Sequence, residues 1–219
     1  HHVRQGVVKG VAVQIIEYDM GDFMLSCAEA YRKAVGEPNM ILRAVDTPFL
    51  EIEEEEEPTG KLQPIASSIL MKLLHGARIA RWDLLKGIQV LSTRVTKWNV
   101  SCDRALHRLI CYVACTANHV LVGFVGDGPD AFRLRQYADA DFAGDRPGFK
   151  STSGAYLSLI GPHTHFPLSA KAVRQTCVAH STPEAEMVSA NSAIRLMGLP
   201  SLDLWEVVLG RKIALDLIE

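Results

Sequence analysis

Three aspartates in one short segment have a spacing that suits metal chemistry. The segment reads Tyr137-Ala-Asp139-Ala-Asp141-Phe-Ala-Gly-Asp145 and follows a run rich in β-forming residues. An Asp inside a strand is disfavoured by propensity, but it is reasonable where a carboxylate must project from a rigid sheet toward a cation. Asp139 and Asp141 would face the same side of such a strand. The alternative is a turn in which these residues serve only as caps.

A second acidic group opens an expected helix further along the chain. In His180-Ser-Thr-Pro-Glu-Ala-Glu186, Ser181 and Glu184 fit a capping box, with a proline in the first turn. The cap accounts for Glu184 by structure alone. Glu186 is not needed for it, so Glu186 can face either the sheet or the solvent. A strand Asp and a helix Glu together would offer the oxygen ligands that hard divalent cations need.

The elements that must position these two groups follow from the hydrophobic pattern after residue 118. Alternating and β-rich runs predict strands, and a three-to-four spacing of apolar residues predicts helices. The expected strands are 120–125, 133–138, 152–160, 166–173 and 211–218. The expected helix is 182–197, ended by Leu199-Pro200, with a further short helical stretch at 202–209. This order predicts an α/β or α+β sheet with the helix on one face.

The first half of the chain reads differently. A short strand is expected within residues 3–18, a helix at 22–34 and an irregular stretch at 39–50. Six Glu occur within residues 51–57, and like charges at this density predict a solvated linker. Three more helices are expected, at 65–78, 82–94 and 103–116.

The stretch 61–119 is strongly basic although the whole chain carries a net charge of −2. It holds nine Lys or Arg against two Asp, which gives a net charge of +7. Such a helical unit can face a phosphate backbone. An ordinary bundle with solvated basic residues explains the charge equally well. The five cysteines form no CxxC pair, so neither a disulfide framework nor a structural zinc site is expected.

Residues 134–219 resemble the ribonuclease H domain of copia-type retrotransposon polyproteins. The matching motifs are YADADFAGD (137–145), KSTSGAYLSLIG (150–161), RQTCVAHSTPEAEMVSA (174–190) and LWEVVLG (204–210). The resemblance implies that Asp139 and Glu186 are catalytic, metal-binding carboxylates of a two-Mg²⁺ site that hydrolyses the RNA strand of an RNA–DNA hybrid. The family's third carboxylate would come immediately after Glu219, so this chain lacks it and is expected to be inactive alone.

Residues 61–117 are similar to the segment that follows the reverse transcriptase palm in the same polyproteins. Ala80-Arg-Trp-Asp-Leu84 stands where the family has a T-R-P-D-I run, and Cys111-Tyr-Val-Ala-Cys-Thr116 stands where it has R-Y-L-K-G-T. The polymerase motif Y-x-D-D is absent, so no DNA synthesis is expected. Basic and polar residues that would contact nucleic acid are Arg81, Lys86, Arg94, Lys97, Arg174 and Gln175.

The expected organisation therefore has three parts. Residues 1–57 would be a remnant of the post-palm region with its acidic linker, 58–119 a basic helical connection region, and 120–219 an incomplete ribonuclease H-like mixed sheet with a helix on one face. The expected partners are an RNA–DNA hybrid and the remainder of the polyprotein, without a membrane, in the cytoplasm or nucleus. The alternative function is a non-catalytic module that binds nucleic acid or protein.

Overall fold

The chain forms two compact units in the computed structural model, which describes residues 1–50, 52, 58–145 and 148–219. One unit combines His1–Tyr18 with Leu121–Glu219, and the other is Asp19–Val120. The first contains the sheet and the second is helical. Most of the Glu-rich linker expected at 51–57 lies outside the described residues. The sequence boundaries 1–57, 58–119 and 120–219 stay predictions.

The sheet has seven strands in the order β1-β2-β3-β6-β5-β4-β7. All neighbours are antiparallel except β4 and β7, which are parallel. The strands are β1 (His2–Val8), β2 (Val11–Tyr18), β3 (Leu121–Val125), β4 (Arg133–Asp145), β5 (Lys150–Gly161), β6 (Thr164–Arg174) and β7 (Leu215–Ile218). Together with the helices, this mixed sheet confirms the α/β fold class and is compatible with a ribonuclease H-like fold.

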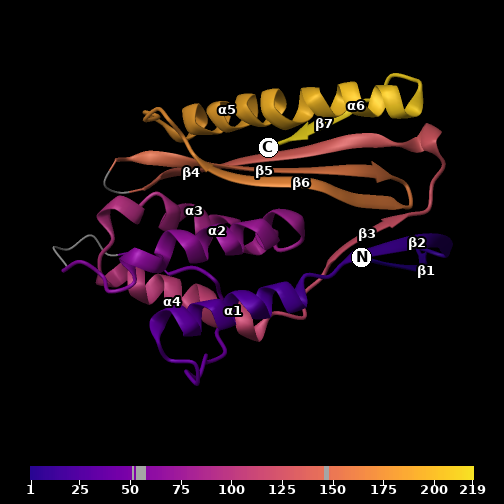
Figure 1. Ribbon diagram of the computed structural model, residues 1–219. Helices are drawn as coiled ribbons and strands as arrows, with labels where there is room; N and C mark the ends of the chain where they lie inside the picture. The colour runs from indigo at the N-terminus through magenta and orange to yellow at the C-terminus, as the bar shows by residue number, and fades with distance from the viewer. Residues whose placement is uncertain (51, 53–57, 146–147) are drawn as a thin grey trace. The chain divides into compact units, whose positions relative to one another are not determined.

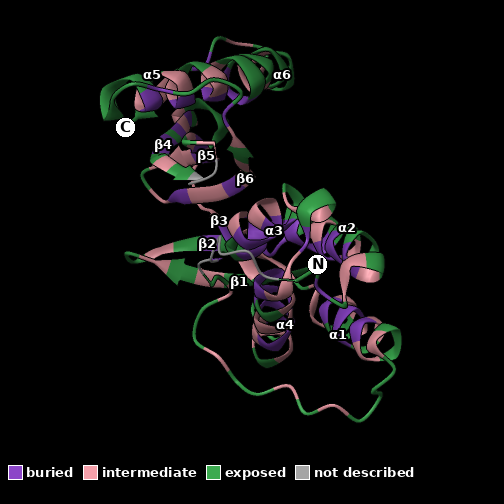
Figure 2. Cartoon of the chain, turned by 90° about the vertical axis from the view of Figure 1, so that its left-hand side faces the viewer, coloured by how far each residue is buried: buried purple, intermediate pink, exposed green. Residues whose placement is uncertain are grey.

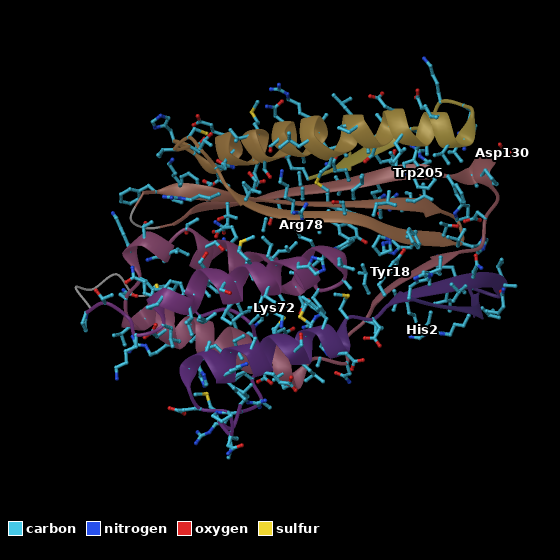
Figure 3. The ribbon with its side chains drawn as sticks, in the orientation of Figure 1. His2, Tyr18, Lys72, Arg78, Asp130 and Trp205 are labelled. Atoms are coloured by element: carbon cyan, nitrogen blue, oxygen red, sulfur yellow. The ribbon has the colours of Figure 1, made fainter. Side chains whose placement is uncertain are left out.

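A helical layer covers one face of β4, β5 and β6 (Figure 1). It consists of α5 (Thr182–Ala193), a π-helical turn (Ile194–Gly198) and α6 (Leu199–Leu209). Leu134 and Leu157 from the sheet and Met197 from the π turn form the core between the layer and the sheet. Trp205 on α6 packs against the same cluster (Figure 3). A short 3₁₀ turn, Pro129–Ala131, lies between β3 and β4.

The expected helix break at Leu199-Pro200 is wrong. The helix continues through the π turn, and Pro200 lies in the first turn of α6. Pro200 has no N–H to donate, and it directly follows the π turn, in which the Leu199 N–H bonds to the Ile194 carbonyl and interrupts the α-helical pattern. The expected cap is confirmed, since the Ser181 hydroxyl accepts from the Glu184 N–H at 3.3 Å. Glu184 reaches back to the His180 N–H at 2.7 Å, one residue earlier than in a standard capping box.

Two strand predictions need correction. The single strand expected within residues 3–18 is a hairpin of β1 and β2, joined at Lys9 and Gly10. Both residues have positive φ, 49° and 80°, as a two-residue hairpin turn requires. The strand expected at 211–218 is shorter, because only Leu215–Ile218 pairs with β4.

The helical unit confirms the helices expected from the apolar spacing. They are α1 (Gly21–Val35), α2 (Gln63–Ile79), α3 (Leu85–Ser92) and α4 (Val100–Cys115), with 3₁₀ turns at Trp82–Leu84 and Val95–Lys97. Residues 39–50 are irregular, as expected. Lys72 on α2 shows how the helices are tied together. Its ammonium donates to the Ser26 carbonyl at 3.0 Å and lies 5.8 Å from the centre of the Phe23 ring (Figure 3).

Candidate active site

Asp139 lies near the middle of β4, on the face opposite the buried residues of that strand. Leu134, Gln136, Ala138 and Ala140 are buried, whereas Asp139 is exposed. This alternation of period two places the Asp139 carboxylate at the surface of a strand that is paired along its length with β5. β4 continues past the expected strand 133–138 to Asp145, so Asp139 lies within a paired strand.

Glu186 lies in the second turn of α5, next to the point where that helix contacts β4. Its neighbour Ala185 is fully buried against Ala140 and Ala179. The buried residues of α5 are Ala185, Ser189 and Ala193, spaced by four, so they form one stripe facing inward (Figure 2). Contact between Ala185 and Ala140 brings the start of α5 against β4. The Asp139 side chain lies on the other face of that strand, and its link to Glu186 is the effect of its negative charge.

The Glu186 carboxylate is in an unfavourable electrostatic position. Loss of water around it raises the pKa of Glu186, and the negative charges of Asp139 and Glu219 raise it further. A hydrogen bond from the Ala140 backbone N–H acts in the opposite direction. Within the described part of the chain, its buried Oε2 atom has no hydrogen-bond partner. A cation at this point would offset the repulsion and would be coordinated by that oxygen.

The parallel strand β7 brings a third acidic residue toward the same end of the sheet. Its register pairs Leu215 with Leu134 and Ile218 with Tyr137. Glu219 follows, and its charge reaches Glu186. Asp216 is not part of this group. It is paired with Arg135 across the strands and forms ion pairs with Arg133 and, at 3.9 Å, with Arg135.

These residues fit a hard divalent cation in kind but not in number. Carboxylate oxygens are the ligands that Mg²⁺ prefers. Among the residues that the structure describes, no group of three or more His, Cys, Asp or Glu is arranged to hold a metal ion. The site therefore offers Asp139 and Glu186, from β4 and α5, with Glu219 near them.

Asp141 differs from Asp139 because β4 becomes irregular after it. The register with β5 shifts between Asp141 and Asp145. Ala143 adopts a positive φ of 52°, and the Asp141 carboxylate lies so close to Gly144 that it would have to move if that residue carried a Cβ. The alternative expected from the sequence, a turn in which the aspartates are only caps, thus describes Asp141 better than Asp139.

Two of the residues expected to contact nucleic acid are interior. Arg81 is 1% exposed and binds Asp83 through two nitrogens, at 3.0 and 2.7 Å, and Thr116 through its carbonyl and hydroxyl. Gln175 is 5% exposed and holds Ser153 and Ala185. Both side chains are committed to interior contacts, so we remove them from the candidate surface. Lys97 is exposed, and Lys86, Arg94 and Arg174 are half-buried.

Ser189 is a site residue that the sequence reasoning missed. Its hydroxyl donates to the backbone carbonyl of Asp139 at 2.7 Å. The signal was present, because residues three apart share a helix face and Ser189 follows Glu186 by three. The sequence alone does not show whether a single helical serine is buried or exposed to solvent, because that depends on which face of the helix packs on the sheet.

Comparison with known proteins points to retroelements. The chain is 37% identical over 100 residues, 45% of its length, to the retrovirus-related Pol polyprotein from transposon RE1 of Arabidopsis thaliana. It is 37% identical over 106 residues, 48% of its length, to the corresponding protein from transposon RE2 of the same plant. The matched region covers 6% of each relative. No family model and no solved structure matches the chain.

These matches support a retrotransposon Pol polyprotein fragment. Over about half of its length the chain is similar to such polyproteins, which supports the expected retrotransposon Pol origin. None of the helices in the described residues is both long and apolar enough to cross a membrane.

Proposed function

We propose that this chain carries part of a ribonuclease H-type site of a copia-like Pol polyprotein, in which Asp139 and Glu186 hold Mg²⁺. The complete site would hydrolyse the RNA strand of an RNA–DNA hybrid, whereas residues 1–219 alone would not. The observation that carries the proposal is the Glu186 carboxylate, whose buried Oε2 lacks a partner while the charge of Asp139 lies close by. Bound Mg²⁺ would activate a water molecule and stabilise the leaving oxygen.

Asp139 and Glu186 would reach the metal from two different elements. Asp139 projects from a strand that is paired with β5 at this position, so its backbone is fixed before a cation arrives. Glu186 approaches from the helical layer, and its raised pKa marks a carboxylate that gains when positive charge is added. The strand order β6-β5-β4-β7 places the parallel strand directly beside the strand that bears Asp139.

Binding of Mn²⁺, which replaces Mg²⁺ and broadens nearby NMR signals, tests the proposal. The amide signals of residues 139–140 and 185–187 should broaden at lower Mn²⁺ concentrations than the rest of the chain. Asp139→Asn and Glu186→Gln should each abolish this selectivity, and Asp203→Asn, an exposed acid on α6, should not. Equal broadening at Asp139 and Asp203 in the unaltered chain would refute the metal site.

A second candidate function rests on the basic helices. Lys61, Arg78, Lys97 and Arg104 are exposed in the helical unit, so a polyanion could reach them. We propose as the alternative a module that binds duplex or hybrid without cleaving it. Its affinity should fall steeply with salt, because phosphate contacts release counterions. Weak binding that is the same at low and high salt would exclude this alternative.

A further inference from the structure

We propose that Ser189 and Gln175 are positioning residues that fix the start of α5 on β4 and β5, and so set the position of Glu186 relative to the strand that bears Asp139. The inference rests on the proposed metal site, but its geometric part can be tested without a metal. Neither side chain would contact the metal or the substrate. Both bind backbone carbonyl groups or a neighbouring side chain at the junction of the helix and the sheet.

Ser189 ties the helix to the strand at the position of Asp139 itself. Its side chain is 1% exposed. The hydroxyl donates to the Asp139 carbonyl at 2.7 Å and lies 3.4 Å from the Gly154 carbonyl on the paired strand β5. Because Asp139 and Gly154 are direct partners in the sheet, the hydroxyl lies over one pair of facing residues of β4 and β5. Any slide of α5 along β4 would break this bond.

Gln175 ties the same helix from the end of β6. Its amide nitrogen donates to the Ala185 carbonyl at 2.9 Å and to the Ser153 hydroxyl at 3.0 Å. Its own backbone N–H donates to the Ser151 carbonyl at 2.8 Å. The peptide that it holds joins Ala185 to Glu186. The bond therefore restrains the backbone immediately before the proposed ligand.

Directional bonds matter here because the apolar contact between α5 and the sheet is small. The inward stripe of α5 consists of two alanines and Ser189, whereas the large side chains of the layer contact the sheet from the π turn onward, beginning with Met197. Small residues allow close approach but do not fix the position along the strand. A carbonyl-directed hydrogen bond does fix it.

The test compares two buried serines of the same unit. Ser189→Ala removes the hydroxyl at Asp139. Ser158→Ala is the matched control. Ser158 on β5 is 0% exposed, and its hydroxyl faces the carbonyl of Arg135 on β4, four residues before Asp139. Gln175→Glu adds an independent variant that keeps the shape of the side chain and loses both amide donors. Thermal unfolding of each variant establishes that the comparison is made on folded protein.

Two readouts separate the inference from the proposed function. Without metal, the NOE between the methyl groups of Ala140 and Ala185 should weaken in Ser189→Ala and Gln175→Glu, and stay unchanged in Ser158→Ala. With Mn²⁺, the affinity of the Asp139 site should fall about tenfold in the first two variants and less than about twofold in the control. An unchanged NOE in both variants overturns the positioning role, whether or not Mn²⁺ binds. If the unaltered chain shows no Asp139-dependent Mn²⁺ site, the proposed function fails while the NOE still decides the inference.

Discussion

Ile218 on β7 lies directly beside Tyr137 on β4, in a parallel register. Parallel strands advance together, one residue on each for every step. A strand that continued past Glu219 in this register would therefore set its second residue after Ile218 beside Asp139. The position where the resemblance expects a third carboxylate is the position that the sheet would place next to the first one.

An extended chain should bind divalent cations more tightly if this register continues. Adding Asp-Asn after Glu219 would place a carboxylate beside Asp139, and the Mn²⁺ affinity should rise about tenfold, because affinity increases with the number of charged oxygen ligands. The matched variant carries Ala-Asn at the same place. Equal Mn²⁺ affinities of the two extended chains would show that β7 does not continue beside Asp139.

Glu186→Gln should stabilise the metal-free protein at neutral pH. The folded protein raises the pKa of Glu186 above its ordinary value of 4.5, so ionisation of Glu186 costs stability at higher pH. Glutamine removes that cost and still accepts the Ala140 N–H. The midpoint of thermal unfolding at pH 7 should rise by about 1–2 °C.

The same comparison has a defined pH dependence. As the pH falls through 4.5, Glu186 becomes protonated in both folded and unfolded chains, and the two proteins should converge in stability. A difference that grows on acidification would contradict the assigned direction of the pKa shift. Excess Mg²⁺ should reverse the order at pH 7, since only the carboxylate gains a counter-charge.

Arg81→Ala should destabilise the helical unit by about 3 kcal/mol. The guanidinium is buried, binds Asp83 through two nitrogens and also binds Thr116, so its loss leaves several groups without a partner. Arg78→Ala is the control, because Arg78 is exposed on the adjacent helix (Figure 3) and should cost less than about 0.5 kcal/mol. Chemical denaturation followed by circular dichroism measures both.

Gly210→Ala should cost about 1 kcal/mol through the backbone alone. Gly210 ends α6 with a φ of +65°, and a Cβ built there meets nothing within 4 Å. Gly128 is a close control, since its surroundings are equally open but its φ is −75°. Gly128→Ala should leave the free energy of unfolding nearly unchanged. Equal losses in the two variants would mean that the turn after α6 does not depend on a left-handed residue.

Much of the fold follows from local pattern, and the exceptions have identifiable causes. Period-two burial in β4 and the Ser181 cap were readable because each depends on residues close in sequence. The continuation of the helix past Pro200 was not, because a π turn has no distinct composition. Arg81 was expected at the surface because charge alone does not reveal an interior partner. Asp83 is a local partner two residues away, whereas Thr116 comes within reach only once the helices have packed.

The candidate site divides in the same way. Asp139 and Glu186 were named from residue type and motif, and the contact between Ala140 and Ala185 brings the elements that bear them together. The contributions of Ser189 and Gln175 depend on which carbonyl groups the packed helix presents, a property of tertiary structure. Sequence periodicity identifies the face of a helix, whereas it does not give the helix's position along a strand.

The π turn of Ile194–Gly198 acts as a one-residue insertion into the helical layer, and the helices on its two sides, α5 and α6, keep their orientation. Inward residues of α5 recur every four positions, which exceeds the 3.6 residues of an α-helical turn, so their direction drifts around the axis. The wider turn takes up that excess before Trp205 is reached. Deletion of a single residue from this turn would convert it into an ordinary α-helical turn, while α5 and α6 keep their inward faces. The helical layer thus has a place where its length can change by one residue without a change of phase.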